Sequence, residues 1–222
     1  MKKVDVILGL QWGDEGKGKV VDVLTPGYQV VARFQGGPNA GHTLEFNGEK
    51  YVLRSIPSGI FQGGKTNIIG NGVALDIRKL VDELRSITDQ GVPAPNLIIS
   101  ERAQLLMPYH KLQDAYEEER LGGKAFGSTK SGIAPFYSDK YAKIGIQVCD
   151  LFHEDRLMER LTAALAIKNV LFQHLYHKPA LDAQELFQQL LSLREEIRPY
   201  VGDAVGFVHQ ALKLSLIHIS EP

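Results

Sequence analysis

The sequence predicts an α/β fold with a largely parallel sheet flanked by helices. Short runs of β-branched and other apolar residues alternate with segments whose apolar residues recur at helical spacing, and this alternation is typical of such folds. The first pair opens the chain: Val4 to Leu8 predicts a buried strand, and Lys17 to Leu24 predicts a helix that stops at Pro26. The connection between them is rich in glycine, with Gly9, Gly13, Gly16 and Gly18.

This first glycine-rich loop predicts a site for phosphate. Unpaired backbone N–H groups and the dipole of the following helix both attract anions. The loop differs from a strict P-loop at Gln11, where that motif has glycine, and at Gly18, where it has serine or threonine. It also contains two carboxylates, Asp14 and Glu15, which a phosphate repels unless a metal ion bridges them or the carboxylate does proton chemistry. The simpler alternative is a glycine turn that only joins strand to helix.

The composition narrows the class of protein. The 222 residues allow one large domain or two modest ones, and the 44% hydrophobic and 23% charged fractions are ordinary for a globular protein. A net charge of -1 gives no broad attraction to nucleic acid or to membranes, so neither is expected as a partner. The single cysteine, Cys149, excludes an internal disulfide and fits a reducing compartment. With no apolar run of membrane-spanning length and no signal-peptide pattern, we expect a cytoplasmic protein.

The next segments continue the alternation of strands and helices. Gln29 to Arg33 predicts a second strand, which ends in a second glycine-rich loop at residues 35–43. Leu44 to Phe46 and Lys50 to Leu53 predict a β-hairpin, because the Asn-Gly pair between them is the strongest two-residue turn signal. Three elements follow: a strand at Asn67 to Ile69 that ends at Gly70-Asn71-Gly72, an amphipathic helix at Asp76 to Gln90, and a buried strand at Leu97 to Ser100.

From Tyr109 onward the sequence predicts mainly helices. Lys111 to Leu121 is a polar helix that stops at two glycines. Lys124 to Lys140 lacks clear periodicity and predicts a third loop, whose small residues, hydroxyls and lysines suit contacts with phosphate. Helical stretches at residues 155–176, 182–200 and 202–213 are expected to form a helical cover on the sheet.

The last nine residues, Leu214 to Pro222, read Leu-Ser-Leu-Ile-His-Ile-Ser-Glu-Pro. This peptide looks like the translation, in one frame, of the transposon-end adapter used in sequencing-library preparation. We therefore expect residues 214–222 to be a sequencing-adapter artefact, and fold reasoning excludes them.

The three loops together offer the groups that phosphoryl transfer requires: a phosphate cradle, a magnesium ligand, a base for the nucleophile, and a cation or proton near the transferred group. His42 lies in a glycine-rich loop and not on an apolar face, so a core role is disfavoured for it. The candidate groups are Asp14, Glu15 and Lys17 in the first loop, Asn39, the Gly41 carbonyl and His42 in the second, and Ser128, Thr129 and Lys130 in the third.

Four segments closely resemble the adenylosuccinate synthetase family. The longest is Gln11 to Lys19, Gln-Trp-Gly-Asp-Glu-Gly-Lys-Gly-Lys, and the second is Gly36 to Thr43, Gly-Gly-Pro-Asn-Ala-Gly-His-Thr; Ile56 to Ile60 and Ile69 to Val73 match as well. The resemblance runs from about residue 4 to residue 213, roughly the amino-terminal half of the family's length. It implies a P-loop-NTPase-like sheet, incomplete in this chain, with a helical subdomain. Residues 1–213 would then be the N-terminal part of a single domain, with the helical cover at about 109–213.

The resemblance implies a GTP-dependent ligase that joins IMP to L-aspartate in purine biosynthesis. Asp14 would take the proton from N1 of IMP and bind Mg²⁺, and the purine 6-oxygen would then attack the γ-phosphate of GTP with His42 acting as acid. Aspartate would displace phosphate from the resulting 6-phosphoryl-IMP. The residue-level argument agrees, because an aspartate held near a lysine and a metal stays ionised and ready to act as a base.

The same resemblance assigns the remaining contacts. Magnesium would be bound by Asp14 and the backbone of Gly41. GTP would be bound by Gly13, Asp14, Glu15, Gly16, Lys17, Gly18, Lys19, Gly41, His42 and Thr43. IMP would be bound by Asp14, Glu15, Gly16, Lys17, Asn39, Ala40, Gly41, His42 and Thr129, the last at the phosphate. Lys143 stands where the family commonly has an arginine that reaches into the partner subunit's IMP site; lysine keeps the charge and loses the bidentate fork, and a plain surface lysine is the alternative. A homodimer is expected from the resemblance alone.

Two alternatives stay open at this point. One is a P-loop-like nucleotide kinase or GTPase that shares only the phosphate cradle, although this reading leaves Gly41-His42-Thr43 unexplained. The other is a non-catalytic half-length protein that binds IMP or GTP. Because the family's guanine and aspartate sites lie beyond Lys213, we expect the 222-residue chain to be inactive by itself, and GTP- and aspartate-dependent loss of IMP would contradict this.

Overall fold

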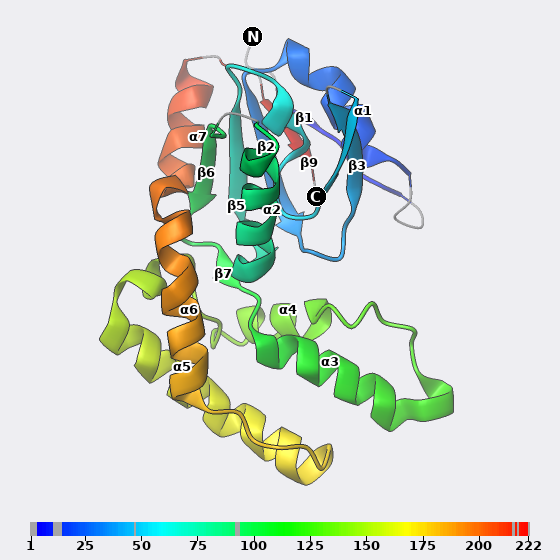
Figure 1. The fold of residues 1–222 in the computed structure, drawn as a ribbon, viewed down its shortest axis with the longest axis vertical. Helices are drawn as coiled ribbons and strands as arrows, with labels where there is room; N and C mark the ends of the chain where they lie inside the picture. The colour runs from blue at the N-terminus through cyan, green and yellow to red at the C-terminus, as the bar shows by residue number, and fades with distance from the viewer. Residues whose placement is uncertain are drawn as a thin grey trace.

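The computed structural model describes residues 4–10, 15–46, 48–91, 94–214, 216 and 218–221. Within them a seven-stranded sheet has the order β1-β9-β2-β5-β6-β8, with β7 paired to one end of β5, and every pairing is parallel. A separate antiparallel hairpin is formed by β3 and β4. The predicted α/β fold with a largely parallel sheet is confirmed (Figure 1).

The strands are β1 (Val4–Val6), β2 (Val30–Gly36), β3 (His42–Phe46), β4 (Glu49–Leu53), β5 (Thr66–Leu75), β6 (Leu97–Ser100), β7 (Gln104–Leu105), β8 (Val201–Gly202) and β9 (His218–Glu221). The α-helices are α1 (Lys17–Leu24), α2 (Ile77–Asp89), α3 (Pro108–Leu121), α4 (Ile133–Tyr141), α5 (Glu154–Val170), α6 (Ala183–Ile197) and α7 (Ala204–Lys213). None of these described helices combines the length and apolar character needed to cross a bilayer.

Helices cover both faces of the sheet because successive strand residues point to opposite sides. On β5, Ile68 packs with Ala204 and Ala211 of α7, whereas its neighbour Ile69 belongs to the larger core that includes Leu80 of α2. Both isoleucines are fully or almost fully buried. The two adjacent residues therefore anchor the two layers that enclose the sheet.

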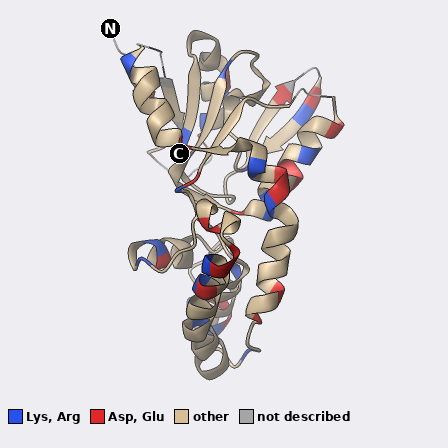
Figure 2. Cartoon of the chain, turned by 90° about the vertical axis from the view of Figure 1, so that its left-hand side faces the viewer, with Lys and Arg blue, Asp and Glu red and all other residues tan. Residues whose placement is uncertain are grey.

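The remaining helices form a second body beyond the carboxyl end of β5 (Figure 1). There β7 pairs with Ala74 and Leu75, the last two residues of β5. Helices α3, α4 and α5 lie below this point, and α6 runs back from α5 to pack against α2. Acidic and basic side chains are interspersed along this part (Figure 2). The large hydrophobic core is continuous from the sheet into the helical body, so the two parts pack as neighbours.

A buried ionic cluster joins three of these helices. Asp139 of α4 accepts hydrogen bonds from His110 Nε2 of α3 at 2.9 Å and from Lys168 Nζ of α5 at 2.8 Å. The Met107 N–H donates to Nδ1 of His110 at 3.0 Å, which makes the imidazole neutral with its proton on Nε2. Burial lowers the pKa of His110. Burial opposes the charged form of Asp139, but the bonds from His110 and Lys168 outweigh it and lower the pKa of that carboxyl.

Several predicted boundaries need correction. The strand at Asn67 to Ile69 continues through Gly70 and Gly72 to become the ten-residue β5. At the bulge in its pairing with β2, a Cβ on either glycine would run into the backbone carbonyl of Arg33 or Phe34. These glycines therefore permit close strand approach, and they do not end the strand.

Two corrections affect the predicted loops. The third loop was expected to extend to Lys140, but Ile133 begins α4, a helix of nine residues with weak apolar periodicity. His42 and Thr43 were placed in the second glycine-rich loop, yet they are the first residues of β3, paired with Leu53 and Val52 of β4. The loop proper therefore ends at Gly41. The predicted turn of the hairpin is present at Gly48, whose φ of 81° suits glycine, while Asn47 lies outside the described residues.

The described part of residues 214–222 includes β9, a strand that was not predicted because this segment was expected to be an artefact. This strand pairs in parallel with β1 on one side and β2 on the other. Ile219 is fully buried beside Val21 of α1 and Val31 of β2. Strand pairing uses main-chain groups that every sequence carries, and the adapter origin of the segment stays a prediction.

Candidate nucleotide-binding site

The glycine-rich loops meet at one edge of the sheet because parallel strands place their carboxyl ends together. The first loop follows β1 and leads to α1, and the second follows Gly36, the last residue of β2. A cavity of about 310 Å³ lies between them. It is lined by Gly16, Lys17, Gly18, Lys19, Gly41, His42 and Thr43, all of which are sequence-predicted site residues. Gly13 and Asp14 lie outside the described residues.

The amino terminus of α1 borders this cavity. Gly16 precedes the helix with a φ of 80°, a left-handed conformation that favours glycine, and no side chain caps the first turn. Its carbonyl accepts from the N–H groups of Lys19 at 3.0 Å and Val20 at 3.2 Å. An uncapped first turn leaves N–H donors at the positive end of the helix dipole, which is the arrangement that binds phosphate.

Lys17 forms an ion pair with Glu15, with Nζ and Oε2 2.7 Å apart. The pair crosses Gly9, where any Cβ would meet the Lys17 and Glu15 side chains. Glu15 was expected to need a metal ion or a proton-transfer role to be tolerated in a phosphate loop. The structure gives it an additional partner, a lysine that offsets its charge.

His42 packs directly on α1. A Cβ on Gly18 would come within 2.5 Å of Cγ of the His42 ring. This contact explains why Gly18 replaces the serine or threonine of a P-loop: the histidine fills the space that such a side chain would need. Nδ1 of the same ring lies 3.2 Å from the Ser58 hydroxyl. Burial, and then the positive charges of Arg33 and Lys17, lower the pKa of His42 to about 4, so the ring is neutral at pH 7.

A buried arginine, Arg33, holds both flanks of the hairpin that begins with His42. Its guanidinium donates through Nη2 to the Gly37 carbonyl at 3.0 Å and through Nη1 to the Arg54 carbonyl. The side chain is 1% exposed although it lies at the predicted end of an apolar strand. Arg33 was not among the predicted site residues, and the one available signal was a charged residue inside a run of buried positions.

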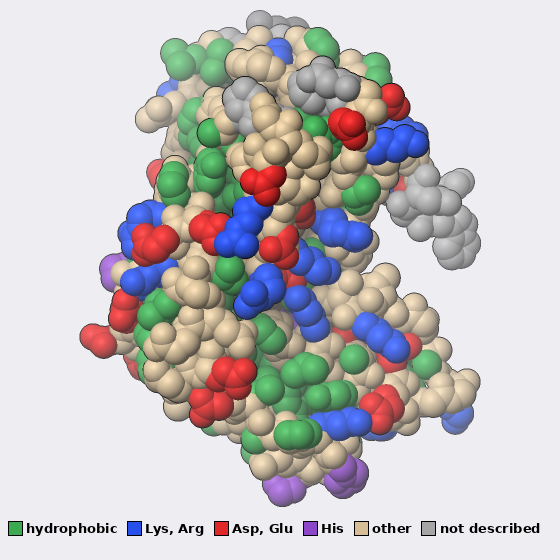
Figure 3. Space-filling view, viewed as in Figure 1, with side chains coloured by type: hydrophobic (Ala, Val, Ile, Leu, Met, Phe, Trp, Pro, Cys, Tyr) green, Lys and Arg blue, Asp and Glu red, His purple; other side chains and the backbone are tan. Residues whose placement is uncertain are grey.

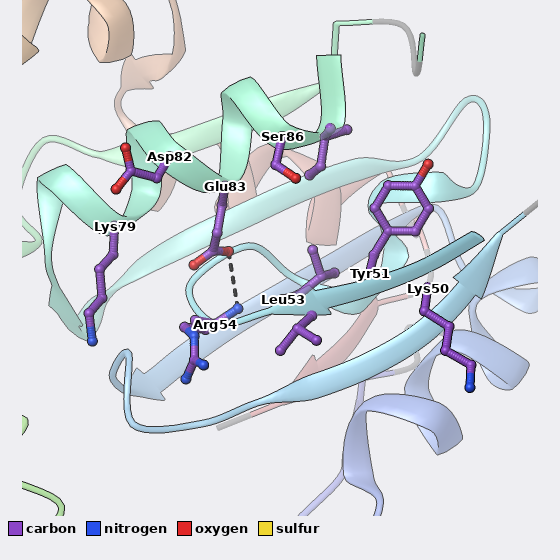
Figure 4. Close-up of a pocket in the computed structure, with 10 residues that line it drawn as sticks. Lys50, Tyr51, Leu53, Arg54, Lys79, Asp82, Glu83 and Ser86 are labelled. Atoms are coloured by element: carbon purple, nitrogen blue, oxygen red, sulfur yellow. Dashed lines mark hydrogen bonds between the residues drawn. The ribbon is translucent and has the colours of Figure 1, made fainter. Parts of the chain in front are cut away.

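Glu83 of α2 holds the outgoing flank of the same hairpin. Its carboxylate accepts from the backbone N–H groups of Arg54 at 3.1 Å, Ser55 at 2.9 Å and Ile56 at 3.1 Å (Figure 4). Burial raises the pKa of Glu83, and these N–H donors oppose the rise. A second cavity, of about 320 Å³, lies beside Glu83 between β4 and α2, and the glycine loops do not line it. Nothing in the sequence signalled Glu83, because an exposed-looking glutamate on an amphipathic helix is ordinary.

The third loop approaches the second through α4. A Cβ on Gly37 would meet Cδ1 of Ile133 at 2.6 Å. Tyr137 Oη accepts from the Gly36 N–H at 3.1 Å and donates to the Gly72 carbonyl at 2.8 Å, so the helix is fastened to β2 and β5. Lys140 Nζ donates to the Asn71 carbonyl at 2.7 Å, and burial lowers its pKa. Lys and Arg side chains gather across this junction between the sheet and the helical body (Figure 3).

The other predicted residues lie in exposed positions. Thr129 and Lys130 are exposed in the third loop. Asn39 and Ala40 occupy a turn after Gly37, in which the Ala40 N–H donates to the Gly37 carbonyl at 3.2 Å. Lys143 is exposed just after α4 with a φ of 64°. The structure thus brings the first and second loops around one cavity and fastens the third through α4.

These features define an α/β protein with a glycine-rich loop between its first strand and first helix. Comparison with known proteins gives the family. The adenylosuccinate synthetase family model matches residues 6–217, and the chain belongs to this family.

Relatives and solved structures agree with the assignment. The adenylosuccinate synthetase of Coxiella burnetii (strain RSA 331 / Henzerling II) is 49% identical over 199 residues, which cover 89% of this chain and 46% of the relative. That of Caldicellulosiruptor saccharolyticus is 43% identical over 213 residues, 96% of this chain and 50% of the relative. The chain thus spans about half the length of the curated relatives it matches.

Among solved structures, the fully ligated adenylosuccinate synthetase of Plasmodium falciparum matches with a TM-score of 0.84 and 29% identity. The match covers 99% of this chain and 51% of that one. A cyanophage S-2L succinoaminodeoxyadenylate synthetase matches with a TM-score of 0.60 and 20% identity, and shows the fold alone.

Proposed function

We propose that the protein to which this chain belongs joins IMP to L-aspartate at the expense of GTP, giving adenylosuccinate, GDP and phosphate. The observation that carries the proposal is the cavity between Gly16–Lys19 and Gly41–Thr43, where an uncapped helix start, Lys17 and His42 converge. Membership of the adenylosuccinate synthetase family supports the choice of substrates. Residues 1–213 would form the N-terminal part of one domain, with the helical part at about 109–213.

The proposed chemistry needs a base and an acid. Asp14 would remove the proton from N1 of IMP, which makes the 6-oxygen nucleophilic enough to attack the γ-phosphorus as GDP leaves. The amine of aspartate would then attack C6, and the phosphate bonded through the 6-oxygen would depart. The amine would also lose a proton. Because the 6-oxygen is phosphorylated first, it would leave as part of phosphate and not as hydroxide.

The contacts of His42 support the proposed acid role. Its pKa of about 4 makes the ring neutral in this structure, so Ser58 at Nδ1 and the Gly18 backbone fix an imidazole and not an imidazolium. A phosphate dianion beside the ring would raise that pKa, because an opposite charge within a few ångströms favours the protonated form. His42 would therefore gain a proton as nucleotide binds and hold it near the transferred group.

The described residues contain no cluster of three or more metal-ligating side chains. Magnesium in nucleotide enzymes is bound by one or two carboxylates together with substrate phosphates and water. The Gly41 carbonyl is a suitable oxygen donor beside the cavity, so the residues fit a magnesium ion held by Gly41 and Asp14 with the nucleotide. When bound, the ion would offset the negative charge of the transferred phosphoryl group.

The remaining proposed contacts are those that the family resemblance implies. GTP would contact Gly13 to Lys19 and Gly41 to Thr43, and IMP would contact Asp14 to Lys17, Asn39 to His42, and Thr129. Lys143 is exposed, as a residue reaching across a homodimer interface would be in one subunit, and we propose that role for it.

The test uses the full-length protein and three assays: adenylosuccinate formation, GTP affinity and IMP affinity. Asp14→Asn should abolish synthesis while much of the nucleotide affinity is kept, and His42→Asn should do the same. Gly27→Ala, in open surface away from the cavity, is the matched control. Turnover without aspartate would favour the kinase or GTPase alternative, and nucleotide binding by the full-length protein without any turnover would favour the non-catalytic one.

A further inference from the structure

Two carboxylates on one face of α3 hold the loop at residues 125–132, here called the 125–132 loop. Asp114 and Glu118 are four residues apart, so they lie one above the other on the helix surface. Both accept hydrogen bonds from the loop and from nowhere else that the described residues show. The loop contains Thr129, the residue proposed at the IMP phosphate.

Glu118 holds the start of the loop. It accepts from the Phe126 N–H through Oε1 at 3.1 Å and from the Gly127 N–H through Oε2 at 2.9 Å. Glu118 itself is only 9% exposed, although it belongs to a mostly polar helix. Two charge-assisted bonds to successive backbone donors fix the path of the chain at this point.

Asp114 holds the rest of the loop on both sides of Thr129. It accepts from the Ser128 hydroxyl through Oδ1 at 2.6 Å and from the Gly132 N–H through Oδ2 at 2.8 Å. The Ser128 oxygen in turn accepts from the Lys130 N–H at 2.9 Å. Residues 128, 130 and 132 are therefore tied inward, directly or through one hydroxyl, to a single carboxylate.

The backbone of the 125–132 loop has positive φ angles at residues that are tied inward. Lys130 has a φ of 53°, a left-handed conformation that is strained for a lysine. Gly132 has a φ of 77° and lies against the backbone of α3, where a Cβ would come within 2.7 Å of the Lys111 nitrogen. With residues 128, 130 and 132 tied inward, Thr129 between them is exposed, shortly before α4, which begins without a side-chain cap.

The position of the Asp114 and Glu118 carboxylates is unexpected beside a phosphate site, because carboxylates repel phosphate. It is explained if the two side chains shape the loop and never touch the ligand. We propose that Asp114 and Glu118 are positioning residues that pre-form the 125–132 loop for the 5′-phosphate of the purine nucleotide. This inference rests on the proposed function, which places IMP at Thr129. A pre-formed loop spares the ligand the entropy of ordering it.

The test compares IMP with inosine, which lacks only the phosphate, by titration calorimetry on the full-length protein. Asp114→Ala should lower the affinity for IMP on the order of tenfold or more while the affinity for inosine is unchanged, because charged hydrogen bonds are worth this much. Asp114→Asn should recover part of the loss, since an amide oxygen can still accept from Gly132. Glu119→Gln is the control: its partner is Lys178 at 2.8 Å, away from the loop.

The outcomes separate this inference from the function on which it rests. If the unmodified protein binds IMP no better than inosine, the proposed phosphate site fails. If it prefers IMP and Asp114→Ala keeps the full preference, the positioning role is overturned. Should Asp114→Ala fold poorly, Ser128→Ala decides, because it removes the bond from Asp114 to Ser128 and the link to Lys130 with a smaller change. It should also lower the preference for IMP, and an unchanged preference would overturn the proposal.

Discussion

The glycine-loop cavity and the ionic cluster of the helical body both concentrate polar groups. The two regions differ in whether those groups complete their hydrogen bonds within the protein. In the cluster, Asp139, His110 and Lys168 are all buried, and Asp139 accepts hydrogen bonds from both of the others. Around the cavity, the first turn of α1 has no side-chain cap, and Lys17 and Thr43 line an open space. A cluster that completes its own hydrogen bonds stabilises a fold, whereas one that leaves backbone donors at an opening can take a ligand.

The largest loss of unfolding free energy is expected from a substitution in the ionic cluster. Asp139→Ala removes the shared acceptor and leaves the Lys168 ammonium buried without a counter-charge, which should cost about 3–5 kcal/mol of unfolding free energy. Urea unfolding followed by circular dichroism measures this loss. Glu195→Gln, on an exposed pair with Arg198, is the matched control. A loss below about 1 kcal/mol would mean that the cluster does not hold the helices together.

A smaller loss of unfolding free energy is expected for a substitution at Gly18, which lies against the His42 ring. Gly18→Ser restores the hydroxyl of a P-loop but drives a Cβ into the His42 ring, so it should cost about 1–3 kcal/mol by overpacking. This outweighs the gain of roughly 0.5 kcal/mol that serine brings over glycine within a helix. Gly27→Ser is the control, since a Cβ there meets nothing within 4 Å. Equal stability of the two variants in urea would show that His42 does not occupy this space.

The two histidines make folding sensitive to acid. The pKa of His42 and that of His110 are both lowered below the ordinary value of 6.5, so the unfolded chain binds protons first as the pH falls. Stability should therefore be complete above about pH 6.5 and fall below it, down to about pH 4 for His42. Urea unfolding at pH 7 and pH 5 tests this, and His42→Asn should show a weaker dependence. A His42 pKa near 6.5 in an NMR titration would contradict the packing described for its ring.

The smallest effect is expected on the exposed surface. Arg85 and Glu196 form a bidentate pair at 2.8 and 2.6 Å that joins α2 to α6. Glu196→Gln should nevertheless change the unfolding free energy by about 0.5 kcal/mol or less, because solvent screens exposed pairs. Thermal unfolding at low and high salt provides the check, and a loss as large as that of Asp139→Ala would remove the distinction between the two kinds of pair.

The sequence predicted the elements whose pattern is local. The helix at Asp76 to Gln90 and the strand at Leu97 to Ser100 are present with almost the expected limits, because apolar spacing alone defines them. β5 was predicted too short, since glycine is an ordinary strand terminator and becomes acceptable here only against the bulged β2. The start of α4 was missed because Gly132 precedes it and its periodicity is weak.

The site was predictable to the extent that its chemistry lies in motifs. The lysine and glycines of the first loop and His42 of the second line one cavity, as their residue types indicated. The residues that hold them, Arg33 and Glu83, bond to backbone groups of residues 54 and 55, which are 21 and 28 positions away, and a carboxylate that accepts from a backbone N–H leaves no trace in a sequence pattern. Asp14 lies outside the described residues, and its role as the base stays a prediction.

The hydroxyl of Tyr137 has a consequence for synthesis of the chain. It bonds to Gly36, 101 residues earlier, so this link between the end of β2 and α4 forms only after Tyr137 has been made. A ribosome adding about 5–20 residues per second needs roughly 5–20 s to make the intervening segment. During that interval the second glycine-rich loop is already outside the ribosome without the helix that fastens it. The second glycine-rich loop is therefore fastened late, once α4 has emerged.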